Sequence, residues 1–295
     1  MAHTFDNNMI TTEQLAKIRE EFNPLVGLRI TWLALPGIAL SGFEPSQVAV
    51  IVNTLLDAAL PQIKLLASSP ENSERLNSID LEKSPRLIGE REAYPDYIHK
   101  SGYRFELKGL FVDNTELGLK RPPTRREPSA RIKDNVTMLN VNPSTDILLM
   151  AAVQLHQFDQ YCHPVVIDIG LFPMIDCIKA RDERMFRLGG RWNGKVPQCI
   201  KKSSIGKFLT GDRLTDEDYQ HDTNFGKMKR IPYIPLQQFL KTHGVPVTII
   251  SPERETEKLK EAATKAKELS GKQGPVKRIR EVQEIFDLDS SGEDE

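Results

Sequence analysis

The chain has few cysteines, no long apolar run and no nucleotide-binding motif. Its 295 residues contain three cysteines, Cys162, Cys177 and Cys199, an odd number without zinc-site spacing, so we expect reduced structural thiols. No segment approaches the length of a membrane-spanning helix, and the first residues lack a signal-peptide pattern. The absence of Gly-x-x-x-x-Gly-Lys-Ser/Thr argues against an ATP-driven motor. We therefore expect a soluble cytoplasmic protein with no membrane partner.

Charge is distributed unevenly along the chain. Hydrophobic residues make up 39%, enough for one substantial core or for a core with a small subdomain. The formal net charge is −1, but residues 252–295 hold twelve acidic and nine basic residues, which leaves a net charge of +2 for residues 1–251. A near-neutral total therefore does not exclude a basic surface that binds nucleic acid.

The last 44 residues differ in character from the rest of the chain. Their pattern predicts a Lys/Glu-rich helix from about residue 253 to 269, a break at Gly274-Pro275, a short helix to Phe286 and a disordered acidic end over residues 287–295. We expect one large domain over residues 1–251 and a charged helical extension over residues 252–295.

The most informative segment runs from residue 94 to 108. Pro95-Asp96 begins a strand pattern, Lys100-Ser101-Gly102 has turn chemistry, and an alternating strand follows. Side chains two apart in a strand share a face. The polar face therefore consists of Arg104, Glu106 and Lys108, and the hairpin brings Asp96 beside Glu106.

These residue types suit metal-dependent hydrolysis of a phosphodiester. Mg²⁺ takes oxygen ligands, often one or two carboxylates together with waters and phosphate oxygens. Asp96 and Glu106 are candidate Mg²⁺ ligands. Lys108 is a candidate catalytic residue that orients the attacking water or neutralises charge on the phosphate. From the residues alone, the alternative is a solvated hairpin face with a Glu–Lys pair.

At these positions the chain resembles the PD-(D/E)XK nuclease superfamily, which includes most type II restriction endonucleases. The match consists of Pro95-Asp96 and Glu106-Leu107-Lys108. The resemblance implies a mixed sheet flanked by helices, metal binding by Asp96 and Glu106, and catalysis by Lys108. It covers about a third of the chain, and its motif is short.

The surrounding sequence predicts the other elements of an α/β fold with a mixed central β-sheet flanked by helices. We expect amphipathic helices over residues 12–22 and 45–66, the second with Val50 and Ile51 among its inward side chains, and a strand over residues 28–38. Residues 144–158 are expected to form a buried crossover helix, and residues 163–172 a buried strand. Glu90 and Glu92 are either an extra pair of helix carboxylates near Asp96 or an exposed acidic turn.

Two basic regions are candidates for contacting DNA. Residues 120–131 are Pro-rich and are expected to be extended. Their arginines suit phosphate anchoring and bidentate contacts to guanine. These candidates are Arg121, Arg125, Arg126 and Arg131. The second region spans residues 181–207 and includes Arg191 in an expected loop over residues 189–194, where Trp192 is either a stacking residue or, as we prefer, a core anchor.

The resemblance predicts a type II site-specific deoxyribonuclease, a Mg²⁺-dependent hydrolase that acts on double-stranded DNA. It implies that residues 1–251 are the catalytic and DNA-binding domain. Such enzymes usually cut palindromic sites as homodimers, because two identical reading surfaces match two half-sites. The alternative enzyme is a structure-selective or DNA-repair nuclease with the same core. The alternative from another class is a non-catalytic DNA-binding or scaffold protein whose hairpin is structural.

Overall fold

The computed structural model describes residues 9–66, 76, 79–85, 94–120, 128, 130–194, 196–222, 224–247 and 252–270. The chain divides into two compact units. Unit 1 comprises Met1–Arg131 and Met138–Cys177, and unit 2 comprises Ile132–Thr137 and Ile178–Glu295. The functional domains expected over residues 1–251 and 252–295 stay predictions. Among the described helices, none combines the length and the apolarity that crossing a membrane requires.

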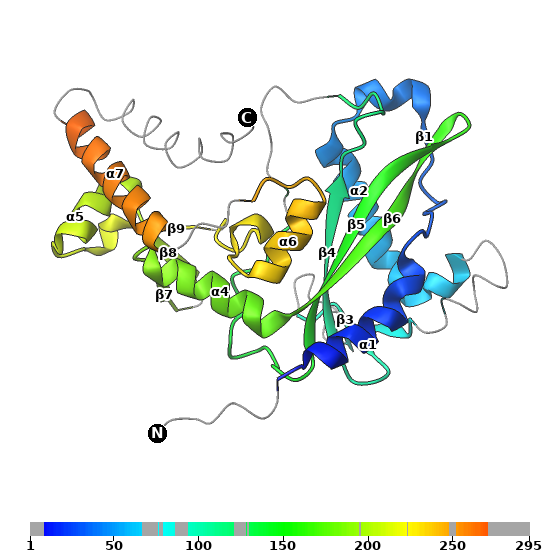
Figure 1. Ribbon diagram of the computed structural model, residues 1–295, viewed down its shortest axis with the longest axis horizontal. Helices are drawn as coiled ribbons and strands as arrows, with labels where there is room; N and C mark the ends of the chain where they lie inside the picture. The colour runs from blue at the N-terminus through cyan, green and yellow to red at the C-terminus, as the bar shows by residue number, and fades with distance from the viewer. Residues whose placement is uncertain are drawn as a thin grey trace. The chain divides into compact units, whose positions relative to one another are not determined.

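Unit 1 is built on a six-stranded, curled mixed sheet with the order β1-β6-β5-β4-β3-β2 (Figure 1). The strands are β1 (Leu35–Pro36), β2 (Leu81–Lys83), β3 (Tyr97–His99), β4 (Arg104–Val112), β5 (Asp146–Phe158) and β6 (Tyr161–Pro173). Strands β4 and β5 run parallel, and all other neighbours are antiparallel. The mixed α/β class predicted from the sequence is confirmed.

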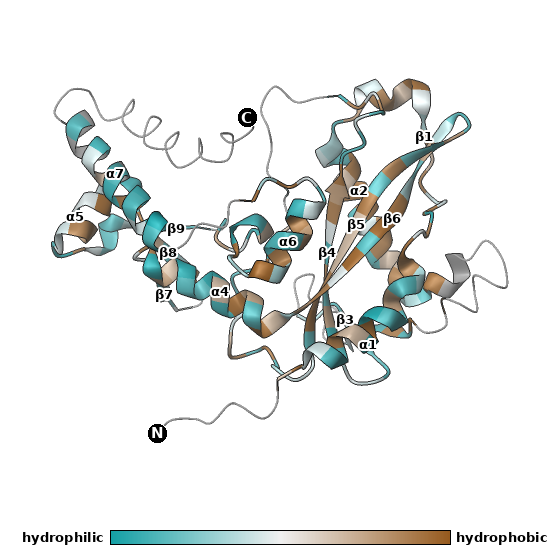
Figure 2. Ribbon diagram, viewed as in Figure 1, coloured by the Kyte–Doolittle hydropathy of each residue, from teal (hydrophilic) through white to brown (hydrophobic). Residues whose placement is uncertain are grey.

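The segment expected as a crossover helix is instead the central strand β5. It pairs with β4 from Asp146 to Gln154 and with β6 along nearly its whole length. Its first eight residues are all buried, because both faces of the strand are covered. Figure 2 shows hydrophobic residues along most of β5. The helix prediction was therefore wrong, and no helix occurs in the described part of residues 113–145 that links β4 to β5.

Two helices cover one face of the sheet. Helix α1 (Thr12–Phe22) begins with a capping box between Thr11 and Gln14, and α2 (Pro45–Ala59) continues into a 3₁₀ helix (Leu60–Leu66). The hydrophobic cluster beneath them joins both helices to alternate side chains of β4 and β5. Its members include Phe22, Val48, Val52, Leu56, Phe105, Leu107, Leu149 and Ala151.

Two details of the upstream prediction were wrong. Val50 and Ile51 are 61% and 40% exposed, because the buried stripe of α2 follows Val48, Val52 and Leu56 instead. The strand expected over residues 28–38 is reduced to β1 and an isolated pairing of Arg29 with Val165. Pro36 cannot donate a ladder hydrogen bond, which limits this edge strand.

Unit 2 contains a small antiparallel sheet and several helices. Its strands are β7 (Arg191–Asn193), β8 (Val196–Ile200) and β9 (Tyr219–His221), and its helices include α5 (Ile205–Thr210) and α6 (Ile234–Thr242). The chain enters unit 2 within α4 (Met174–Arg187). The loop expected over residues 189–194 is thus partly the strand β7. Trp192 packs against the cluster of Met185, Cys199 and Phe225, as a core anchor does.

The predicted Lys/Glu-rich helix is confirmed as α7 (Pro252–Ser270). Its Leu259 and Ala263 pack against Ile200 and Ile205. Its Glu255 accepts hydrogen bonds from two α4 arginines, Arg184 Nε at 3.0 Å and Arg187 Nη2 at 2.6 Å. Burial lowers the pKa of Arg184, and Glu255 opposes that shift. The rest of the extension, including the expected short helix and acidic end, lies outside the described residues.

Candidate active site

The β3–β4 hairpin predicted from the sequence is present. Tyr97 pairs with Phe105 and Ile98 with Arg104, and one residue further along this register Asp96 falls opposite Glu106. Gly102 closes the turn with a φ of +87°, a conformation that glycine adopts without steric cost. The register of the hairpin thus places the two acidic residues that the sequence predicts as a pair opposite each other on neighbouring strands.

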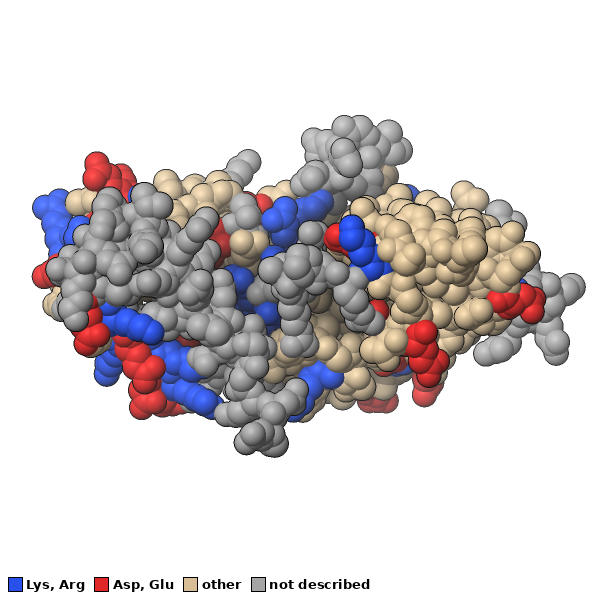
Figure 3. All heavy atoms as spheres, turned by 90° about the horizontal axis from the view of Figure 1, so that it is seen from above, with Lys and Arg blue, Asp and Glu red and all other residues tan. Residues whose placement is uncertain are grey.

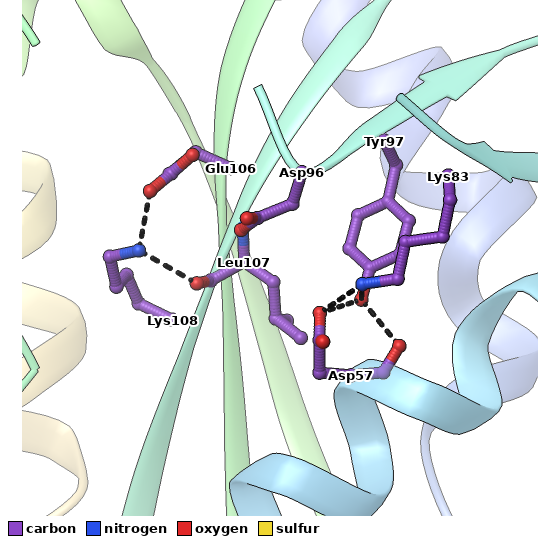
Figure 4. Close-up of polar contacts among 7 residues, drawn as sticks. All are labelled: Asp57, Lys83, Asp96, Tyr97, Glu106, Leu107 and Lys108. Carbon is purple, nitrogen blue, oxygen red and sulfur yellow. Dashed lines mark hydrogen bonds and ion pairs between the residues drawn. The ribbon is translucent and has the colours of Figure 1, made fainter. Parts of the chain in front are cut away.

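Glu106 and Lys108 lie on the same face of β4 and form an ion pair (Figure 4). Lys108 Nζ is 2.6 Å from Glu106 Oε1 and also donates to the Leu107 carbonyl oxygen at 3.0 Å. Glu106 is 3% exposed, and the Lys108 side chain is 14% exposed. These contacts fix the ammonium beside the carboxylate, on the face opposite to the one that α1 and α2 cover.

Asp96 is anchored to the same strand. Its Oδ2 accepts a hydrogen bond from the Leu107 N–H at 2.8 Å. Burial raises the pKa of Asp96, while Lys108 and the Leu107 N–H oppose that increase. The site therefore keeps a carboxylate in a place where its charged form is poorly solvated.

Arg104, the third polar residue of the predicted face, is engaged in a buried network. Its Nε donates to Asp146 Oδ1 at 2.5 Å, while Tyr94 O–H and Asn142 N–H donate to Asp146 Oδ2 at 2.6 and 2.9 Å. Burial, followed by the charge of Asp146, raises the pKa of Tyr94. This network joins the start of β4, the start of β5 and the residue before Pro95. Sequence reasoning missed Asp146, because it placed that residue at the start of a helix.

A second polar cluster lies on the other side of β4 in Figure 4. Lys83 Nζ is 2.6 Å from Asp57 Oδ1 and lies over the Tyr97 ring, 4.4 Å from its centroid. The Tyr97 hydroxyl donates to both the carbonyl and the carboxylate of Asp57. Asp57 and Lys83 also act on the pKa of Asp96, the first raising it and the second lowering it. One local feature could have indicated this cluster, namely a carboxylate within the mostly apolar segment of α2.

Helix α2 lies directly against β4 beside this cluster. A Cβ atom at Gly109 would come within 1.6 Å of Asn53 Oδ1. Glycine leaves room for the Asn53 side-chain amide against β4, and a larger residue at position 109 would require that amide to move.

Two carboxylates of the site, Asp96 and Glu106, are the residues that could hold a hard divalent cation. No group of three or more His, Cys, Asp or Glu residues suited to a metal occurs in the described part of the chain. Asp96 and Glu106 alone match the usual Mg²⁺ arrangement, in which waters and substrate phosphate complete the shell. A cation there would also favour the ionised form of the buried Asp96. Glu90 and Glu92 lie outside the described residues.

The predicted DNA-binding arginines differ in whether the structure describes them and in what they contact. Arg121, Arg125 and Arg126 lie outside the described residues, and Arg131 is exposed. Arg191 contacts Asp216 and lies over the Tyr219 ring, 4.0 Å from its centroid. Their roles in DNA binding stay predictions.

Three arginines of the second basic region are buried or partly buried. Arg181 is 3% exposed and donates to the carbonyl oxygens of Lys133 and Val136 at 3.0 and 2.9 Å. Arg184 and Arg187 bind Glu255, as described above. Where unit 2 is drawn in Figure 3, basic and acidic side chains are mixed on the face shown. These three arginines therefore stabilise unit 2, and contact of this region with DNA stays a prediction.

The chain matches no protein-family profile, no curated protein sequence and no solved structure.

Proposed function

We propose that the protein is a Mg²⁺-dependent endonuclease that hydrolyses phosphodiester bonds in double-stranded DNA, with a restriction-endonuclease-like core. The observation that carries this proposal is the contact between Glu106 and Lys108 on one face of β4, with Asp96 bonded to the same strand. The acid-x-lysine spacing and the preceding aspartate are the elements of the PD-(D/E)XK motif that this chain resembles.

Each residue has a defined role in the proposal. Asp96 and Glu106 would hold the ion, which when bound would polarise the phosphate and lower the pKa of a coordinated water. Lys108 holds its ammonium at a fixed place, through Glu106 and the Leu107 carbonyl, where negative charge develops on the phosphate. The Arg104–Asp146–Tyr94 network positions the hairpin and does not contact the reacting atoms.

The topology supports the proposal only in part. An antiparallel hairpin followed by a strand parallel to β4 agrees with the mixed sheet that the resemblance implies. The crossover helix of that pattern is missing from the described residues between β4 and β5. The proposal therefore depends more on the positions of Asp96, Glu106 and Lys108 than on the order of helices and strands.

The specific activity we propose is that of a type II restriction endonuclease acting as a homodimer on a palindromic site. Two copies of one reading surface would match two half-sites and place one active site on each strand. In a structure-selective or repair nuclease, the same three residues would act in a monomer. In a non-catalytic DNA-binding protein, the Glu106–Lys108 ion pair would only stabilise the sheet.

Digestion of a sequenced plasmid with the purified protein and Mg²⁺ separates these functions. Discrete fragments support a site-specific endonuclease, whereas a smear supports a different nuclease. Absence of cleavage, with DNA binding retained, supports the non-catalytic alternative. Light scattering supplies the oligomeric state, and a monomeric mass with and without DNA contradicts the homodimer.

Alanine substitutions at Arg121, Arg125, Arg126, Arg131 and Arg191 test DNA reading in the same system. Loss of a base contact costs about 1–3 kcal/mol and relaxes specificity at one base pair, whereas loss of a phosphate contact weakens all sequences alike. Cognate and single-mismatch duplexes distinguish the two. Five variants with unchanged affinity would exclude these arginines as DNA contacts.

A further inference from the structure

Asp96 lies immediately before the first residue of β3, and segments on both sides of it hold it in place. On one side, the Leu107 N–H of β4 donates to the Asp96 carboxylate at 2.8 Å. On the other side, the N–H of Ser84, the residue after β2, donates to the Asp96 carbonyl oxygen at 3.1 Å, and Ser84 is 2% exposed. The direction of this candidate metal ligand therefore depends on how β2, β3 and β4 are held together.

Tyr97, the next residue, joins this part of the sheet to helix α2. Its side chain is fully buried in the cluster beneath α2, and it pairs across the strands with Lys83 of β2 and Phe105 of β4. Its hydroxyl donates to the Asp57 carbonyl oxygen at 2.8 Å and also to the Asp57 carboxylate, near the end of α2. A buried hydroxyl requires such a partner, whereas a phenylalanine ring would fill the same space without one.

Lys83 completes the connection between the sheet and the helix. Its ammonium lies 2.6 Å from Asp57 Oδ1 and 3.3 Å from the Tyr97 hydroxyl oxygen (Figure 4). The Asp57 and Lys83 side chains are 46% and 38% exposed, and an exposed ion pair contributes only about 0–1 kcal/mol to stability. The main effect of these contacts is therefore to join α2, β2 and β3 at the residue next to Asp96.

The orientations of Tyr97 and Asp96 are coupled through the backbone. Successive side chains of a strand point to opposite faces, so a rotation of the strand moves both of them. A rotation that moved the Tyr97 hydroxyl away from Asp57 would also turn the Asp96 carboxylate away from the Leu107 N–H. Residues that orient a metal ligand in this indirect way contribute to metal affinity as well as to activity.

We propose that Tyr97 is a positioning residue for the candidate metal site, and that its hydroxyl, held by Asp57 and Lys83, fixes the direction of the Asp96 carboxylate. The inference rests on the proposed function, because it takes Asp96 as a ligand of the divalent cation. It adds to the site a group of side chains that act through Asp96 and do not contact the reacting atoms.

Mn²⁺ binding, measured by calorimetry without DNA, tests this role independently of cleavage, since Mn²⁺ prefers the same oxygen ligands as Mg²⁺. Tyr97→Phe keeps the buried ring and should weaken Mn²⁺ binding about tenfold, because loss of a contact that orients a metal ligand has effects of this order. Tyr103→Phe is the matched control: it removes a hydroxyl from the same hairpin, and its Mn²⁺ affinity should equal that of wild type.

Val48→Ala separates positioning from a general loss of stability. Val48 is fully buried in α2, and its truncation removes core packing without removing any polar group of the Asp57–Lys83–Tyr97 cluster. Urea unfolding should show that Val48→Ala and Tyr97→Phe are both folded, and Val48→Ala should bind Mn²⁺ like wild type.

The outcomes separate this inference from the proposed function. If wild type and Tyr97→Phe bind Mn²⁺ equally, or if Val48→Ala loses as much affinity as Tyr97→Phe, the positioning role is wrong and the proposed metal site stands. If only Tyr97→Phe binds Mn²⁺ more weakly but wild type cuts no DNA, the positioning role holds and the nuclease proposal fails. An unfolded Tyr97→Phe protein makes the hydroxyl a requirement of the fold and overturns the inference. Failure of the wild type to bind Mn²⁺ overturns both.

Discussion

Substitution of Asp146 by alanine should destabilise unit 1 more than loss of any surface carboxylate. The Asp146 side chain is fully buried, and it accepts hydrogen bonds from Arg104, Tyr94, Asn142 and Thr145. Removing one partner of a buried ion pair costs about 3–5 kcal/mol. Each buried donor left without an acceptor costs about 1–3 kcal/mol, and such costs do not add fully.

We therefore expect Asp146→Ala to lower the free energy of unfolding by about 4 kcal/mol. Urea unfolding followed by circular dichroism measures this change. Asp80→Ala is the matched control: its side chain is 45% exposed and lies 3.9 Å from Lys100 Nζ, so its loss should cost less than about 1 kcal/mol. Equal unfolding free energies for the two variants would refute the role of Asp146 as the junction of β4, β5 and the hairpin.

Gly109→Ala should cost about 1–3 kcal/mol in urea unfolding, because its methyl group would collide with Asn53. Asp96→Asn should stabilise the metal-free protein at neutral pH, because burial raises the folded-state pKa of Asp96 and so disfavours its charged form. The protonated Asp96 contributes stability at low pH, and this contribution is lost as the pH rises through the folded-state pKa. The stability advantage of the variant should therefore shrink as the pH falls towards about 4. Glu255→Ala should release α7 and speed its proteolysis, because it leaves the guanidinium of Arg184 buried without its carboxylate partner.

Local sequence patterns predicted the elements whose signals are themselves local. The capping residues and apolar spacing of α1, the turn and alternation of the β3–β4 hairpin, and the charged periodicity of α7 each depend on neighbours in the chain. The hairpin register also placed Asp96 beside Glu106, since strand pairing and a short turn fix which residues face each other.

The central strand and the supporting polar residues could not be predicted in this way. A continuous apolar run rich in Leu, Met and Ala fits a buried helix and a doubly covered strand equally well, and only pairing with β4 and β6 decides between them. That error also hid Asp146, whose partner Arg104 is 42 residues away in the chain. Asp57 likewise meets Lys83 and Tyr97 through packing of α2 on the sheet, which no local pattern encodes.

Single-turnover cleavage of supercoiled plasmid by wild type, Asp96→Ala and Lys108→Ala is the most direct test of the proposed active site. Wild type should cut only with Mg²⁺, and Asp96→Ala should bind DNA without cutting it. Lys108→Ala should cut far more slowly, while its metal requirement is little changed. Asp80→Ala should cut like wild type. Near-normal cleavage by folded Asp96→Ala or Lys108→Ala protein would contradict the assignment of these residues to the active site.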